Sequence, residues 1–236
     1  MRYAEPSIHQ GIQSLLDHDP TIDHIVAVPL YPHYAMATTK TVVEKMNDVV
    51  ESNFPNIAVN YLQPFYNHPY YIQSLSTSIR DHLPQSFDHL LFSYHGIPVR
   101  HLKKTDPTKS HCYKVADCCN TPCQEAHDVC YRHQVMTSTN KVIESLGLRS
   151  DQYSVAFQSR LGLDEWLKPA TDSEIERLAK SGVKNLAICC PAFVADCLET
   201  LEEIGEEGEE IFLENGGESF TLIPCLNDDD TWVQAF

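Results

Sequence analysis

The sequence is poor in positive charge. It has 17 Lys and Arg residues against 33 Asp and Glu residues, so its net charge at pH 7 is −16. Binding to nucleic acid depends on clusters of Lys and Arg that contact phosphates. We therefore expect no nucleic-acid partner, and the acidic balance suits a cation or a neutral substrate.

Long apolar runs are also lacking. No stretch is long enough to cross a bilayer, and the first residues, MRYAEPSIHQ, contain neither a basic segment nor an apolar core. We therefore expect no membrane-spanning helix and no export signal, and we predict a cytoplasmic location. With 236 residues, 42% of them hydrophobic, the chain can bury the core of one large domain or of two ordinary ones.

The most unusual stretch is PAFVADCLETLEEIGEEGEE, which begins at Pro191 and ends at Glu210. Seven of the twelve residues from Glu199 to Glu210 are glutamate. At helical spacing they form two ladders, Glu199, Glu203 and Glu207 on one face and Glu202, Glu206 and Glu210 beside it. Like charges four residues apart repel each other, so a solvated acidic face is one interpretation. The other is a path for a divalent cation, which prefers oxygen ligands.

Short apolar runs alternate with amphipathic segments along the whole chain. Strands are predicted near 24–30, 57–62, 90–94, 153–157, 185–190 and 220–224. Helices are predicted from about Ser7 and near 38–51, 68–82, 135–146 and 171–182. Capping boxes at Ser7 with Gln10 and at Thr171 with Glu174 support two of the helix starts. This alternation predicts an α/β protein with parallel sheets, in which ligands bind beyond the carboxyl ends of the strands.

Three motifs give a specific resemblance. SYHGIP at 93–98, FQSRLG at 157–162 with Trp166, and PAFVADCLETLEEI at 191–204 resemble the ferrochelatases, which insert ferrous iron into protoporphyrin IX to form protohaem. The likeness is to the bacterial enzymes and extends over nearly the whole chain. It implies two Rossmann-like, chelatase-type domains whose parallel sheets are flanked by helices. It also implies a lyase-type reaction, the last step of haem biosynthesis, with Fe2+ as a substrate and no nucleotide cofactor.

The resemblance also implies roles for individual residues. His95 and Glu199 are the catalytic candidates, and His95 would either accept a pyrrole proton or hold iron briefly. The implied metal-binding residues are His95, Glu199, Glu203, Glu207 and Asp196, on a helix that the family distorts toward π geometry. The candidate porphyrin-binding residues are Arg2, Tyr3, Tyr34, Trp166 and Phe193. Ordinary core packing is the alternative for Trp166 and Phe193.

Five of the nine cysteines lie within nineteen residues: Cys112, Cys118, Cys119, Cys123 and Cys130. Crowding of this kind favours metal ligation over disulfide bonds. Some ferrochelatases hold a [2Fe-2S] cluster on an internal insert, and the resemblance is to these; four of the five thiolates would be ligands. A Cys3His zinc site that uses His111, His127 or His133 is the alternative. The other four cysteines are expected to be buried thiols.

The predicted domains are residues 1–83, residues 84–225 with the cysteine-rich insert at 110–131, and 226–236 as the start of a carboxy-terminal segment. The first domain would lack the amino-terminal βα units with which ferrochelatases normally begin. The main alternative is therefore a truncated, non-catalytic Fe-S or metal-binding protein of the same family, and a chelatase for another tetrapyrrole or metal is a second. The expected partner is a porphyrin. Transient contact with a membrane or with a haem-pathway enzyme, and the oligomeric state, are left open.

Overall fold

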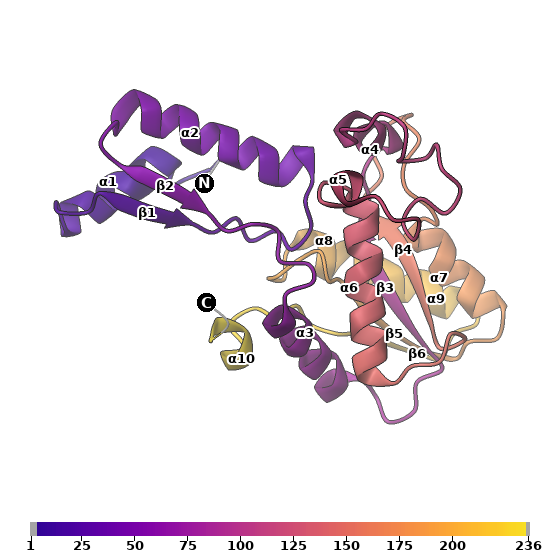
Figure 1. The fold of residues 1–236 in the computed structure, drawn as a ribbon. Coiled ribbons are helices and arrows are strands. Elements are labelled where there is room, and N and C mark those ends of the chain that lie inside the picture. The colour runs from indigo at the N-terminus through magenta and orange to yellow at the C-terminus, as the bar shows by residue number, and fades with distance from the viewer. Residues whose placement is uncertain (1–3, 235–236) are drawn as a thin grey trace. The chain divides into compact units, whose positions relative to one another are not determined.

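The computed structural model describes residues 4–234, which form two compact units (Figure 1). The first unit ends at Phe65 and the second begins at Tyr66. The boundary therefore lies before helix α3, Pro69–His82, which the sequence analysis placed in the first domain. The physical reason is that α3 packs against helix α6, Tyr131–Leu146, of the second unit.

The first unit is a small parallel α/β layer. Its elements are α1 Ile8–His18, β1 His24–Ala27, the π-helix η1 Met36–Lys40, α2 Thr41–Asn53 and β2 Ala58–Tyr61. The capping box at Ser7 is confirmed, because its side chain accepts from the Gln10 N–H and the Gln10 side chain accepts from the Ser7 N–H. Strands β1 and β2 pair in parallel, and a core around Ile12, Met46 and Phe54 joins the helices to the sheet.

The second unit is built on a four-stranded parallel sheet in the order β4-β3-β5-β6. Its strands are β3 His89–His95, β4 Tyr153–Gln158, β5 Asn185–Cys189 and β6 Ser219–Leu222. The helices apart from α3 and α6 are α4 Val99–Thr105, α5 Gln124–His127, α7 Thr171–Lys180, α8 Leu198–Thr200, the π-helix η2 Leu201–Glu207, α9 Gly208–Glu214 and α10 Asp230–Val233. The parallel α/β architecture predicted from the alternation of apolar runs is thereby confirmed.

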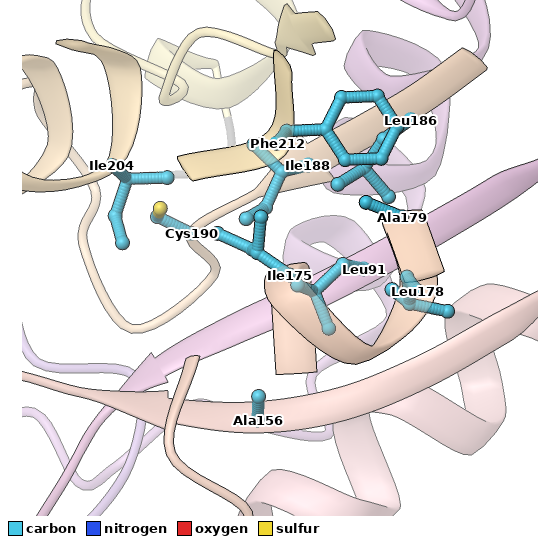
Figure 2. Packing of buried hydrophobic residues seen from close by; sticks show 10 residues of the cluster. All are labelled: Leu91, Ala156, Ile175, Leu178, Ala179, Leu186, Ile188, Cys190, Ile204 and Phe212. Carbon is cyan, nitrogen blue, oxygen red and sulfur yellow. The ribbon is translucent and has the colours of Figure 1, made fainter. Parts of the chain in front are cut away.

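Helices cover both faces of this sheet. Helices α3 and α6 lie on one face, and α7 and α9 lie on the other (Figure 1). The central strand β3 is buried on both faces from His89 to Tyr94. This fits its sequence HLLFSY, which contains no charged residue and places apolar side chains on both faces of the sheet. On the α7–α9 side, Figure 2 shows a single apolar cluster in which side chains from strands and helices interdigitate: Leu91, Ala156, Ile175, Leu178, Ala179, Leu186, Ile188, Cys190, Ile204 and Phe212.

The glutamate stretch is helical, and its middle has π geometry, as the resemblance implied. One predicted capping box is wrong, although the helix begins at the predicted residue. The N-cap of α7 is Ala170, and Thr171 is already inside the helix. Thr171 cannot cap because its hydroxyl forms a buried hydrogen bond with Ser93, at 2.8 Å, and Glu174 pairs instead with Arg177.

The cysteine-rich segment follows α4 and leads into α6, and α5 is its short helix. Across residues 4–234, no helix combines the length and apolar character needed to cross a membrane. The cytoplasmic location stays a prediction.

Candidate functional site

The candidate site of the second unit lies at the carboxyl ends of its strands. His95 is the last residue of β3, Gln158 is the last residue of β4, and Phe193 lies in the loop after β5. Glu199 follows in the first turn of the continuous helical segment 198–214, which consists of α8, η2 and α9 and is called the glutamate helix below. Parallel strands bring these segments to one rim, where ligands of open α/β sheets bind.

His95 is half-buried at this rim. Its Nδ1 lies 2.6 Å from the carbonyl oxygen of Gly96. A carbonyl can only accept, so Nδ1 carries the proton and Nε2 retains a lone pair. The ring packs near Phe193, with 6.1 Å between ring centroids. The side chain therefore presents one free basic nitrogen, which can accept a proton or bind a metal.

Glu199 provides a carboxylate in the electrostatic neighbourhood of His95. Hydrogen bonds from the Cys197 thiol and from the Glu199 backbone N–H lower the pKa of Glu199, and so does its electrostatic interaction with His95. Glu199 is therefore ionised near neutral pH. The two side chains thus interact electrostatically, and their role as a catalytic pair, implied by the resemblance, stays a prediction.

A chain of buried polar side chains fixes the position of Glu199. Gln158 donates to the backbone carbonyl of Glu199 at 2.8 Å and accepts from the Ser93 hydroxyl at 2.8 Å. Ser93 also bonds the hydroxyl of Thr171. All three of these side chains are almost fully buried, so each bond is protected from water. The start of the glutamate helix is thus attached to the ends of β3 and β4 and to α7.

The next carboxylate of the ladder, Glu203, is held by Ser159. The Ser159 N–H donates to one Glu203 oxygen at 2.7 Å, and the Ser159 hydroxyl donates to the other at 2.5 Å. Ser159 adopts a left-handed backbone conformation, with φ of 62°, which turns both donors toward the helix. Glu203 and Glu207 line one cavity of about 540 Å³, together with Asp172, whose carboxylate pairs with Arg160 at 2.9 Å.

Asp196 lies at the head of the same helix, but its oxygens are engaged. It accepts from the Asn227 side chain at 2.7 Å and from the Cys225 N–H at 3.1 Å. Burial raises its pKa, but these hydrogen bonds outweigh burial, and the net effect is a lowered pKa. Its bonds attach the head of the helix to the segment after β6.

The predicted porphyrin-binding residues are distributed over both units. Trp166 is half-buried, and its indole N–H donates to the Leu161 carbonyl at 3.0 Å. Phe193 packs against the core cluster and also lies near His95, and its contact with a porphyrin stays a prediction. Tyr34 belongs to the first unit and lines a cavity of about 400 Å³ there. Arg2 and Tyr3 lie outside the described residues.

Four of the five crowded cysteines are buried: Cys112, Cys118, Cys119 and Cys130. The thiols of Cys112 and Cys119 donate hydrogen bonds to the Cys130 sulfur, so these bonds lower the pKa of Cys130 and raise the pKa of its two donors. The electrostatic influence of Cys118 also raises the pKa values of Cys112 and Cys119. Cys123 is half-buried and precedes α5. Buried sulfurs therefore converge on Cys130.

Three histidines surround this group of sulfurs. His111 and His127 each place Nε2 within 2.9 Å of the Cys118 carbonyl, and His133 places Nδ1 2.8 Å from the Cys119 carbonyl. These nitrogens must donate, so they are not free to bind a metal. In the described part of the chain, no three His, Cys, Asp or Glu side chains form a ready site for a single metal ion.

Sequence reasoning missed three residues that act on the site. Gln158 and Ser159 lie in the FQSRLG motif, yet nothing in the motif says that they hold Glu199 and Glu203. Cys197 was expected to be a buried thiol, but it is half-buried, as is Cys225, and it donates to Glu199. Its place two residues before Glu199, at the N-cap, is the one local signal that could have indicated this contact.

Comparison with known proteins gives a consistent picture. The family model "Ferrochelatase" matches residues 1–236. A ferrochelatase of Pseudomonas fluorescens is 47% identical over 235 residues, which cover all of this chain and 68% of that protein. One from Ectopseudomonas mendocina is 48% identical with the same coverage, and one from Opitutus terrae is 46% identical over 246 residues, or 70% of its length.

Solved structures agree on the fold alone. SirB from Bacillus subtilis with Fe3+ superposes with a TM-score of 0.62 at 14% identity and covers 98% of this chain and 75% of SirB. The sirohydrochlorin chelatase SirB in complex with cobalt gives a TM-score of 0.60 at 12% identity, over 100% of this chain and 75% of that structure. The chelatase-type fold expected from the motifs is thereby confirmed.

Proposed function

This chain belongs to the ferrochelatase family, and on that basis we propose that it inserts Fe2+ into protoporphyrin IX, the step that forms protohaem. The observation that carries the proposal is the placement of His95 and Glu199 on one rim. His95 offers an unprotonated Nε2, and Glu199 offers an ionised carboxylate in its electrostatic neighbourhood.

Metal insertion requires the removal of two pyrrole protons and the delivery of a partly dehydrated cation. The lone pair on His95 Nε2 suits the first task, because a neutral imidazole accepts a proton near neutral pH. The carboxylate of Glu199 suits the second, since carboxylate oxygens bind a divalent cation yet can release it. The same pair of groups could also exchange these roles, with His95 as a transient ligand of iron.

The cation path of the proposal runs along Glu199, Glu203 and Glu207. The support is that Glu203 is oriented by two hydrogen bonds from Ser159 and shares a cavity with Glu207. Asp196 enters the proposal as the residue that fixes the head of the helix, because its oxygens already accept hydrogen bonds. Trp166, Phe193 and Tyr34 are the proposed aromatic contacts of the macrocycle.

Zn2+ insertion into protoporphyrin IX, followed by fluorescence under anaerobic conditions, tests the catalytic assignment. We expect insertion by the 236-residue chain and its loss in His95→Ala and Glu199→Gln. His24→Ala, which removes an exposed histidine of β1, is the matched control and should keep full activity. Equal rates in His95→Ala and the control would refute the assignment. A folded chain that inserts no metal would favour a non-catalytic metal-binding role.

We also propose that the cysteine-rich segment binds a [2Fe-2S] cluster through Cys112, Cys118, Cys119 and Cys130. A cluster of this type takes four thiolates, and these four sulfurs are buried, with three of them in direct contact. The cluster would supply redox or structural chemistry to the segment. A Cys3His zinc site is the alternative, because His111, His127 and His133 each donate one ring nitrogen to a carbonyl and have a second nitrogen that can bind zinc.

Absorption spectra and iron and zinc contents of the anaerobically purified chain test this ligand set. We expect visible cluster bands that are lost in Cys130→Ser and kept in Cys123→Ser. If zinc copurifies in place of iron, the zinc site is correct. If both variants keep the bands, Cys130 is not a ligand and the proposed set is wrong.

A further inference from the structure

The peptide group that joins His95 to Gly96 is held from two sides. Its N–H, which belongs to Gly96, donates to the Gln158 carbonyl at 2.8 Å. Its oxygen, which belongs to His95, accepts from the hydroxyl of Tyr131 at 2.8 Å. A peptide group is planar, so fixing both of these atoms fixes the rotation of the backbone on either side of it.

This peptide group determines how the His95 ring can act. Nδ1 of the ring donates to the carbonyl of Gly96, the next peptide along the chain. If the peptide between the two residues turned, that carbonyl would move and the bond that keeps the proton on Nδ1 would weaken. The free lone pair on Nε2 therefore depends on the two contacts that hold the peptide, from Gln158 and from Tyr131.

Tyr131 connects this peptide to the cysteine-rich segment. It is the first residue of α6, its side chain is 5% exposed, and burial raises the pKa of its hydroxyl, so the group remains a proton donor. Its neighbour in the chain is Cys130, the sulfur on which Cys112 and Cys119 converge and the N-cap of α6. A shift of the Cys130 backbone would thus be transmitted through one residue to the oxygen of His95.

We propose that Tyr131 is a positioning residue for His95 and that it couples the cysteine-rich segment to the catalytic rim. The inference rests on the proposed function for the importance of His95, but the contact itself is independent of that function. Two readouts are therefore needed: one on metal insertion and one on the His95 ring.

Tyr131→Phe removes only the hydroxyl, and Tyr94→Phe is its matched control. Tyr94 is also buried, and its hydroxyl bonds Thr139 of the same helix α6 at 2.8 Å, so both tyrosines link β3 to α6. The difference is that Tyr131 alone of the two bonds the His95 carbonyl. We expect kcat for Zn2+ insertion to fall about 3- to 10-fold in Tyr131→Phe, as the loss of one hydrogen bond predicts, with little change in KM.

The second readout is the 15N NMR spectrum of histidine-labelled protein, with the His95 resonances assigned by their absence in His95→Ala. We expect Tyr131→Phe to shift the resonances of the His95 ring nitrogens, and Tyr94→Phe to leave them unchanged at a similar melting temperature. Equal effects of the two variants would overturn the proposal. Because the spectrum needs no turnover, a chain that inserts no metal would refute the proposed function and leave this test intact.

Cys130→Ser tests the coupling separately. If the cysteine-rich segment acts on His95 through Tyr131, Cys130→Ser shifts the His95 resonances in the wild-type background and produces no further shift in the Tyr131→Phe background. Additive shifts in the double variant would show a different route and would overturn the coupling. If Tyr131→Phe by itself fails to fold, Cys130→Ser in the wild-type background remains the test, and unchanged His95 resonances there would overturn the coupling.

Discussion

Gly96 has no space for a side chain. A Cβ atom there would lie 2.8 Å from the Gln158 carbonyl oxygen and 3.2 Å from a ring carbon of Trp166. We predict that Gly96→Ala destabilises the protein by about 1–3 kcal/mol, because a backbone atom must move to relieve the contact. It should also lower metal insertion, since the moved peptide is the one next to His95.

Urea unfolding of Gly96→Ala and Gly11→Ala measures this difference. Gly11 lies inside α1 with nothing within 4 Å of its Cβ position. Gly11→Ala should therefore stabilise the chain by roughly 0.5–1 kcal/mol through helix propensity. A stable, fully active Gly96→Ala would show that the loop after β3 is not close-packed.

At the scale of single residues, sequence reasoning gives candidates for the reactive chemistry and misses the groups that hold them. His95 and Glu199 stand in recognisable motifs. Ser159 and Tyr131 act through hydrogen bonds to Glu203 and to the His95 carbonyl, and such contacts depend on tertiary placement. A serine or tyrosine has no local pattern that reveals its distant acceptor.

The glutamate helix makes a prediction at the scale of the element. Glu203→Gln keeps the shape of the side chain and removes its charge, so we expect the KM for the metal to rise several-fold while the KM for porphyrin changes little. Glu206→Gln is the control, because Glu206 is exposed and belongs to the other ladder. Steady-state kinetics with varied metal concentration would measure both. An equal rise in both variants would indicate general attraction by the acidic surface.

Most element types follow from apolar periodicity, and the exceptions have physical causes. The strands and the long helices lie close to their predicted positions, because each buries an apolar face with the expected period. The π-helix η1 was missed at the start of the predicted 38–51 helix, since an i+5 turn has no distinct periodicity. The capping box at Thr171 was wrong because a tertiary partner, Ser93, takes its hydroxyl.

Acid stability is a prediction for the molecule as a whole. Hydrogen bonds from Thr108 and from the N–H groups of Cys112 and His111 outweigh burial and lower the pKa of Asp106 to about 2. Its pKa is therefore lower in the folded chain than in the unfolded chain, where an Asp carboxyl has its usual pKa of 3.8. Between these values the unfolded chain binds more protons, so this stabilisation is complete above about pH 4 and is lost as the pH falls toward 2.

The pKa values of four other carboxyl groups are also lowered, and these groups add to the loss of stability in acid: Asp88, Asp196, Glu174 and Asp229. Urea unfolding at constant ionic strength should show a fall in stability below about pH 4, with a shallower fall in Asp106→Asn. Relief of the repulsion from a net charge of −16 acts in the opposite direction. A stability that rises steadily to pH 3 would show that this relief dominates.

Two-domain organisation is predictable from the sequence, but the place of the boundary is not. The periodicity of α3 shows an amphipathic helix, whereas the surface that it covers is set by its contact with α6. Likewise, the crowding of five cysteines predicts a shared site, and only the tertiary structure selects the buried sulfurs around Cys130.

The order of the sheet has a consequence for the time course of synthesis. Strand β3 lies between β4 and β5, and both of these neighbours follow it in the chain, beyond the cysteine-rich segment. On the ribosome, β3 and the five cysteines therefore emerge before either neighbouring strand exists. Both edges of β3 stay without a strand partner until the chain beyond the cysteine-rich segment has been made.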